Sequence, residues 1–228
     1  MKVIARGTGK AHPQPNDCVR MRYTAWTRSG EPAGRSTDDE GGEQACMRGM
    51  TPGLAEAVAA MVVGEQRRVW IPEALAFPVD PKDDDQPRRK TALTYDLTLL
   101  SVLAAPATPR TLKRAPSNAR KLASGVAVEL VKKGAGTAHP DPSQQLTMHL
   151  SCWTPDGVLH ESTRFGGKPL VYRIAELVPG LGEGLQQLVV GDVARFWIPA
   201  ALAYGNKPRR RGQPPGNLVY EVELVGLE

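Results

Sequence analysis

An internal repeat runs through most of this chain and limits the folds open to it. RGTGKAHPQP begins at Arg6 and KGAGTAHPDP begins at Lys133, an offset of 127 residues. Further matched pairs keep that offset: Trp26 and Trp153, Gly30 and Gly157, Pro52-Gly53-Leu54 and Pro179-Gly180-Leu181, and Trp70-Ile71-Pro72 and Trp197-Ile198-Pro199. Near the ends, Tyr95 pairs with Tyr220 at an offset of 125, which indicates a shortened loop. Two copies, each of domain size, predict two domains rather than a solenoid.

The segment between the copies differs from both in composition. Residues 1–103 and 125–228 each carry balanced charge, whereas residues 104–124 hold five basic residues, three prolines and no acidic residue. We therefore expect domains at 1–103 and 125–228, joined by a basic Pro/Ala-rich linker at 104–124. Such a linker is typical of a soluble, self-repelling tether, and it is also able to hold an acidic partner or nucleic acid weakly.

The two copies share one pattern of secondary structure. Short runs alternate apolar and polar residues and predict strands. Each copy has one run at helical spacing, opened by a proline and followed by a glycine. These helical positions are Leu54, Val58 and Met61 in the first copy, and Leu181, Leu185 and Leu188 in the second. An antiparallel sheet with one short helix across it is an α+β domain, and we predict two such domains.

Three features bound the cellular context. No apolar run has the length of a signal peptide or a membrane span, so we expect a cytoplasmic protein without membrane contact. Cys18, Cys46 and Cys152 are odd in number and widely spaced, and we expect reduced structural thiols rather than a disulfide framework or zinc site. We expect no metal and no cofactor, and a monomer, since no additional dimerisation segment is visible.

A series of short motifs follows a fixed order in the second copy. After a Gly-x-Gly start come Asp156-Gly157, Pro179-Gly180, Val190-Gly191, Phe196-Trp197-Ile198-Pro199, Leu202-Ala203-Tyr204-Gly205, Pro214-Pro215 and a closing strand from Val219 to Leu224. In this order they resemble the FKBP family of macrolide-binding prolyl isomerases. The match covers essentially all of the second copy and is as long but looser in the first. It implies proline-containing protein clients, macrolide ligands and an apolar pocket that twists the X–Pro amide without a nucleophile or metal.

The resemblance also assigns the pocket of the second copy. It implies Tyr204, which donates its hydroxyl to the ligand carbonyl, and Glu161, in place of the family's Asp, as the catalytic residues. The substrate-binding residues it implies are Leu150, His160, Leu170, Tyr172, Leu177, Val178, Leu181 and Tyr220. Several depart from the family pattern, because Leu150 replaces a Tyr, His160 replaces a Phe, and Leu181 stands where Trp is common.

The pocket of the first copy departs from the family pattern at other positions. The resemblance implies a pocket of Tyr23, Met50, Leu54, Phe77 and Tyr95. Phe77 replaces the carbonyl-binding Tyr, and the lost hydrogen bond costs about 0.5–1.5 kcal/mol. The acidic position falls near Gly34 or Arg35, with the alignment ambiguous by one residue. We expect this copy to be weak or inactive.

Three functions remain open on the sequence. The first, which we favour, is a peptidyl-prolyl isomerase acting mainly through the second copy. The second is a binding or scaffolding module with degraded pockets. The third is nucleic-acid binding through the basic linker and Arg209–Arg211, against which we weigh the balanced charge of each copy and the lack of clustered aromatic residues.

Overall fold

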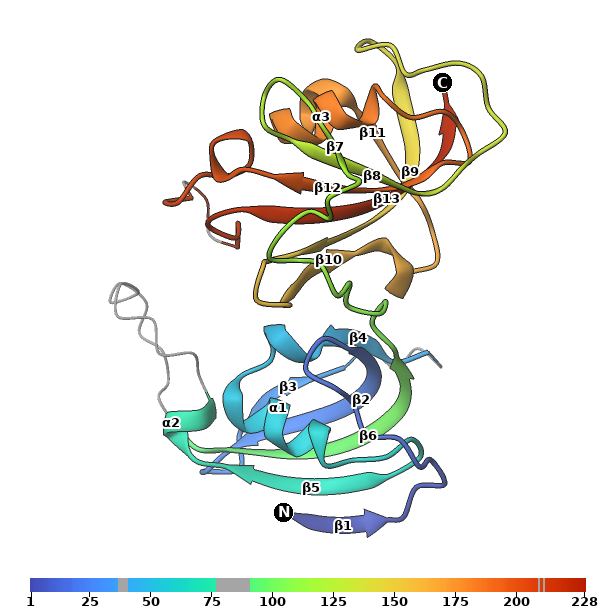
Figure 1. Cartoon of the computed structure of the whole chain (residues 1–228). Coiled ribbons are helices and arrows are strands. Elements are labelled where there is room, and N and C mark those ends of the chain that lie inside the picture. The colour runs from blue at the N-terminus through green and yellow to red at the C-terminus, as the bar shows by residue number, and fades with distance from the viewer. Residues whose placement is uncertain (37–40, 77–90, 209, 211) are drawn as a thin grey trace. The chain divides into compact units, whose positions relative to one another are not determined.

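The computed structural model describes residues 1–36, 41–76, 91–208, 210 and 212–228. The chain divides into two compact units, Met1–Ala104 and Ala105–Glu228, called here the first and second domain (Figure 1). Within the described ranges, no helix is both long and apolar enough to cross a membrane.

The first domain is an antiparallel sheet with a helix across one face (Figure 1). Its elements are β1 (Lys2–Ala5), β2 (Cys18–Thr27), β3 (Pro32–Arg35), β4 (Glu43–Cys46), α1 (Pro52–Ala59), β5 (Gln66–Ile71), α2 (Glu73–Ala76) and β6 (Leu93–Leu103). The strand order is β1-β5-β6-β2-β3, and β4 also pairs with β2. Buried residues of α1, β2, β5 and β6 form its core.

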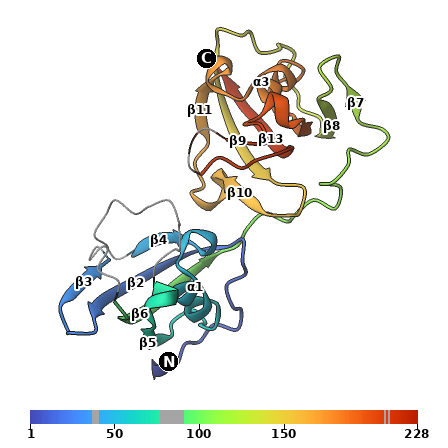
Figure 2. The same cartoon turned by 90° about the vertical axis from the view of Figure 1, so that its left-hand side faces the viewer.

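The second domain repeats this plan with one addition. Its elements are β7 (Arg120–Lys121), β8 (Ala127–Lys132), β9 (Gln145–Trp153), β10 (Leu159–Ser162), β11 (Leu170–Arg173), α3 (Pro179–Leu185), β12 (Val193–Ile198) and β13 (Leu218–Leu227). The order is β10-β9-β13-β12-β8-β7, and β11 pairs with β9 (Figure 2). All pairings are antiparallel, so the predicted α+β class is confirmed for both copies.

Both helices are shorter than the apolar pattern indicated. Each begins with a proline at its first turn, where a missing N–H costs nothing. The last predicted apolar residues, Met61 and Leu188, lie in the turns that follow, where their N–H groups donate to the carbonyls of Val58 and Leu185, each at 3.0 Å. Met61 and Leu188 are nevertheless buried, because the turns keep their side chains in the core.

The segment expected as a linker packs on the second domain. Its strand β7 pairs with β8, and the Trp197 indole Nε1 donates to the carbonyl of Thr111 at 2.7 Å. Leu112 is buried with Trp153 and Trp197 in a separate cluster on the sheet face opposite α3. Trp197 is 8% exposed, whereas its counterpart Trp70 in the first domain is 54% exposed. Residues 105–124 are therefore a structural layer of the second domain rather than a free tether.

The cysteines differ from the sequence expectation. Cys18 on β2 and Cys46 at the end of β4 are opposite each other in the strand register and form a disulfide. Cys152 is free and buried on β9. The prediction of three reduced thiols is thus wrong for two of them, since pairing of β2 with β4 brings together residues that are 28 positions apart in the sequence.

Candidate functional site

The second domain contains a pocket of about 350 Å³ between its sheet and the start of α3. It is lined by Leu150, Glu161, Leu170, Tyr172, Glu176, Leu177, Val178, Pro179, Leu181, Tyr204 and Tyr220. Four strands, β9, β10, β11 and β13, and the approach to the helix supply most of these side chains. The pocket therefore depends on contacts between parts of the chain that are distant in sequence.

Strand register places the apolar wall. Strand β9 lies between β13 and β11, so Leu150 of β9 stands opposite Val222 of β13 while Leu170 of β11 stands opposite Met148. Side chains two residues apart on a strand share a face, which puts Tyr220 on the same side as Val222. Both Leu150 and Tyr220 are buried, at 5% and 2% exposure.

The first turn of α3 provides the base of the pocket. Pro179 begins the helix, and the N–H of Leu181 donates to the carbonyl of Val178 at 3.0 Å. This turn directs Leu181 into the core, where it is 1% exposed, and leaves Leu177 and Val178 half-buried at the pocket edge. The base is consequently dry and aliphatic.

Tyr204 is held at the mouth by a short folded loop. The N–H of Gly205 donates to the carbonyl of Ala200 at 2.9 Å, and the N–H of Gly216 donates to the carbonyl of Gly205 at 2.9 Å. Gly205 has φ of +77°, a conformation that a residue with a Cβ rarely adopts. Tyr204 itself is half-buried against the domain core.

Three polar side chains meet at one end of the pocket. Tyr204 and Tyr220 both line the pocket, and the Cys152 side chain lies beside Tyr220, because the two residues stand opposite each other in the register of β13 with β9. Burial raises the pKa of Tyr204 and of Tyr220 above the ordinary phenol value, so both hydroxyls keep their protons at neutral pH. Burial also raises the pKa of the Cys152 thiol to about 12, which leaves it an unreactive thiol.

Glu161 adds a carboxyl group to this polar end. The residue is exposed as a whole, yet its side chain lines the pocket, and desolvation there raises the pKa of the carboxyl above its usual value. It stands opposite Cys152 in the register of β10 with β9. The pocket therefore combines an aliphatic wall, protonated phenols and one carboxyl group.

The structure brings together every pocket residue that the sequence assigned to the second copy except His160. His160 precedes Glu161 on β10, is exposed and is not among the residues that line the pocket. Glu176 and Pro179 line it but were missed. Glu176 Oε2 accepts a hydrogen bond from the N–H of Arg173 at 2.9 Å, a local capping contact that no family motif marks.

The residues assigned to the first copy lie around the same part of its sheet. Tyr23, Met50, Leu54 and Tyr95 all pack partly buried against the core of the first domain. The Tyr23 and Tyr95 rings are 6.0 Å apart between centroids, tilted by 52°. Phe77 lies outside the described residues.

Two differences distinguish this first-domain site. Burial raises the pKa of Tyr23, and the charge of Glu43 and a hydrogen bond with its carboxyl group raise it further. Glu43 occupies the position of Leu170 in the repeat, so a charge replaces an apolar wall residue, a difference the motif comparison did not single out. In addition, Gly34 stands opposite Ala25 just as Glu161 stands opposite Cys152. This register assigns the acidic position to Gly34, not Arg35.

The chemistry available at the second-domain pocket is that of binding and solvent exclusion. Among the described residues, no cluster of three or more His, Cys, Asp or Glu side chains is arranged to hold a metal. The aliphatic base suits an uncharged ring, and the phenol hydroxyls can donate to a carbonyl at its rim.

Comparison with known proteins gives one family. The model of FKBP-type peptidyl-prolyl cis-trans isomerases matches residues 9–100 and 136–225. The peptidyl-prolyl cis-trans isomerase Fkbp12 of Drosophila melanogaster is 33% identical over 107 residues, covering 46% of this chain and 99% of that protein.

Two further comparisons involve longer proteins. The outer membrane protein MIP of Legionella longbeachae is 32% identical over 110 residues, covering 47% of this chain and 46% of that protein. This chain therefore spans about half the length of that relative. The crystal structure of the three FKBP domains of wheat FKBP73 is 22% identical with a TM-score of 0.41, covering 100% of this chain and 93% of that one.

Proposed function

Because this chain belongs to the family of FKBP-type peptidyl-prolyl cis-trans isomerases, we propose that it accelerates rotation about X–Pro bonds in protein clients, mainly through its second domain. The observation that carries the proposal is the second-domain pocket, which the half-buried Tyr204 lines together with an aliphatic base formed around Leu181. Family membership supports the class of client, which is proline-containing protein chains.

Rotation of the amide follows from solvent exclusion in this proposal. The barrier of about 18–20 kcal/mol arises from resonance in the planar amide, which water stabilises because the planar form is the more polar one. Placing the proline ring against Leu150 and Leu181 removes that water. The Tyr204 hydroxyl then donates to the client carbonyl, and its raised pKa keeps the donor proton in place at neutral pH.

We propose that the first domain contributes little to turnover. Gly34 occupies the register position of Glu161, and Glu43 brings a charge to the place of Leu170. Ionised side chains resist transfer into a dry pocket, so Glu43 disfavours an apolar ring beside Tyr23. These two observations support the low turnover proposed for the first domain.

The test is an isomerisation assay on the full chain that needs no coupled protease, using a proline-containing peptide. Tyr204→Phe removes one hydroxyl, and we expect the rate enhancement to fall about twofold to tenfold, the worth of one hydrogen bond. Phe77 already lacks the hydroxyl at the counterpart position, so the comparison in the first domain is Tyr23→Phe, which removes a hydroxyl from that site and should lower the rate less. Equal losses of rate enhancement in both variants would refute the proposal that the second domain supplies most of the activity. A folded wild-type chain without any rate enhancement would refute the enzyme and leave two binding domains.

A further inference from the structure

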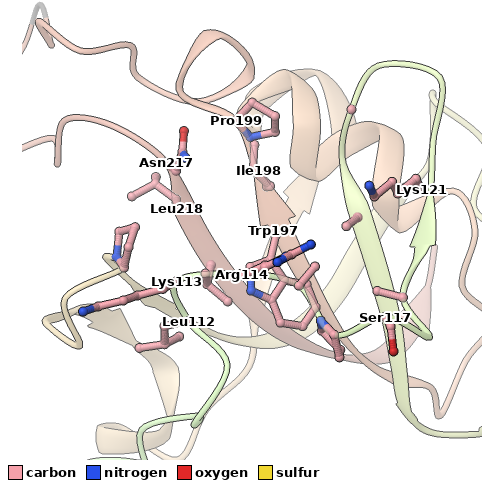
Figure 3. A pocket seen from close by; sticks show the side chains of 17 residues that line it. Leu112, Lys113, Arg114, Ser117, Lys121, Trp197, Ile198, Pro199, Asn217 and Leu218 are labelled. Atoms are coloured by element: carbon pink, nitrogen blue, oxygen red, sulfur yellow. The ribbon is translucent and has the colours of Figure 1, made fainter.

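A second hollow lies on the face of the second-domain sheet opposite α3. It has a volume of about 650 Å³ and is enclosed by the packed segment 112–121 and by parts of β8, β12 and β13 (Figure 3). None of its lining residues lines the Tyr204 pocket. Adjacent strand residues point to opposite faces, so Val219 borders this groove while Tyr220 borders the Tyr204 pocket.

The floor of the groove is apolar and dry. Leu112, Ala127, Trp197, Leu218 and Val219 are all below 9% exposed. The Trp197 ring is fixed because its Nε1 donates to the carbonyl of Thr111. This floor offers contact to an apolar side chain. The volume of the groove lies within the range of pockets that hold small ligands, about 300–1,000 Å³.

The rim of the groove is positively charged. Lys113, Arg114 and Lys121 line it and are exposed, and in the described part of the chain none of the three has an ion-pair partner. No Asp or Glu occurs among the described residues that line the groove. Figure 3 shows that all three cations come from the one segment that closes the groove over the strands.

A polar donor completes the rim at its other side. Asn217 is exposed, and its Oδ1 accepts a hydrogen bond from the N–H of Ala200 at 2.9 Å. That bond orients the side chain and leaves its amide nitrogen as a donor. An acceptor-rich ligand therefore meets donors on both sides of the groove.

From this arrangement we propose that the groove binds an acidic peptide segment in which an apolar side chain is flanked by carboxylates. The apolar side chain rests on the floor around Trp197, and the carboxylates pair with Lys113, Arg114 and Lys121. Charge complementarity selects the occupant, since a groove with a cationic rim and no Asp or Glu among its described lining residues attracts anionic ligands and repels basic ones.

Nucleic acid fits the groove less well. Proteins that bind single strands present exposed aromatic faces on which bases stack. Among the described residues that line the groove, the only aromatic one is Trp197, which is 8% exposed and held by Thr111. The carboxylate-bearing peptide is thus the occupant that both the floor and the rim favour.

The test uses the full chain and a fluorescein-labelled peptide of alternating glutamate and leucine, followed by fluorescence anisotropy. The groove variant is Lys113→Glu/Arg114→Glu/Lys121→Glu. The matched control is Lys10→Glu/Arg28→Glu/Lys133→Glu, which changes net charge equally at exposed residues that do not line the groove. We expect the groove variant to bind about tenfold more weakly, as three exposed charge pairs predict, and the control within about twofold of wild type.

Two more arms separate the groove from general charge attraction. Ser117→Trp keeps every charge and fills the groove from an exposed position, so binding should also weaken about tenfold. Replacing glutamate by glutamine in the peptide should have a similar effect. Equal weakening in both charge variants, or unchanged binding in Ser117→Trp, overturns the site. Binding of an oligothymidylate with no binding of the acidic peptide overturns the choice of occupant.

Discussion

Single positions account for the contrast between the two pockets. Glu161 and Gly34 hold one register position in two copies of the same hairpin, yet only Glu161 brings a carboxyl group to its pocket. Gly34 leaves room for a side chain, because an added Cβ would lie 3.8 Å from the nearest atom, Cε2 of Tyr23. The absence of a carboxyl at this position therefore reflects the residue chosen and not a steric limit of the fold.

Glu161 should make the stability of the second domain depend on pH. Desolvation raises its pKa in the folded state, so ionisation of this carboxyl costs folding free energy. Below the unfolded-state pKa of about 4.5 the carboxyl is protonated in both states, and burying it costs no ionisation free energy. As pH rises through the raised folded-state pKa, this part of the free energy of unfolding is lost. Glu161→Gln cannot ionise. In thermal unfolding, the variant should match wild type in acid and become relatively more stable above that pH; a constant difference across pH would contradict the assignment.

The sequence was sufficient to assign a pocket residue where a motif of the ordered series includes it or lies beside it. It was not sufficient where the role of a residue depends on a contact with a distant part of the chain. Tyr204, Tyr220, Leu177 and Leu181 could be assigned to one pocket because each sits in or beside a recurring motif. Glu43 could not be assigned, since its importance lies in the charge that it brings close to Tyr23 from another strand. Nothing in the local pattern around Glu43 indicates that partner.

At the scale of elements, the helix and the strand beneath it have changed together between the copies. In the second domain an added Cβ on Gly184 of α3 would lie 2.5 Å from Cδ1 of Phe196 on β12. The equivalent residues in the first domain are Ala57 and Val69, both buried. The first domain pairs the larger helix residue, Ala57, with the smaller strand residue, Val69. The second domain pairs the smaller helix residue, Gly184, with a larger strand residue, which conserves core volume.

This complementarity predicts a coupled pair of substitutions. Gly184→Ala alone should destabilise the second domain by about 1–3 kcal/mol through overpacking against Phe196. Phe196→Val also destabilises the domain by itself, because it empties buried volume, but the added methyl group partly fills that space. The double-mutant cycle should therefore give a favourable coupling energy in chemical denaturation. Gly166→Ala is the control, because its Cβ would have only one neighbour, at 3.9 Å. Strict additivity of the two changes would show that the residues do not share the packing.

The whole molecule is where the sequence interpretation and the structure diverge most. The repeat and its alternation were sufficient to predict two α+β domains. From its composition, segment 104–124 was predicted to be a linker, because its prolines, alanines and basic residues lack the regular spacing of apolar residues that predicts a helix or a strand. Their packing depends on Trp153 and Trp197, which lie on strands later in the chain. Cysteine spacing likewise cannot reveal that β2 and β4 are neighbours.

The disulfide gives a prediction that concerns each domain differently. Reduction should destabilise the first domain by about 3–4 kcal/mol, the expected effect of opening a loop of this length. The second domain should not respond, since its one cysteine is buried and free. Thermal unfolding with and without reductant checks this, with Cys46→Ser as the variant insensitive to reductant. Equal responses from both domains would contradict the prediction.

The same bond bears on where the protein resides. Disulfides persist mainly in oxidising compartments, and the cytoplasmic location expected from the sequence stays a prediction. Alkylation of protein taken from its native source, followed by mass spectrometry, decides the matter. Labelled Cys18 and Cys46 support the cytoplasm, and protection of both until reduction contradicts it.

The packed segment 105–124 also gives the molecule a mechanical property. Its attachment rests on the short β7–β8 pairing, the Trp197 to Thr111 hydrogen bond and one small apolar cluster. These contacts are few compared with those of either sheet, so a pulling force applied at the two chain ends should release this segment before the central strands of either sheet separate. At full extension about 20 residues span roughly 70 Å. The chain thus stores a reserve of length that it can release under load at the cost of the edge strand β7, while the other strands of both sheets stay paired.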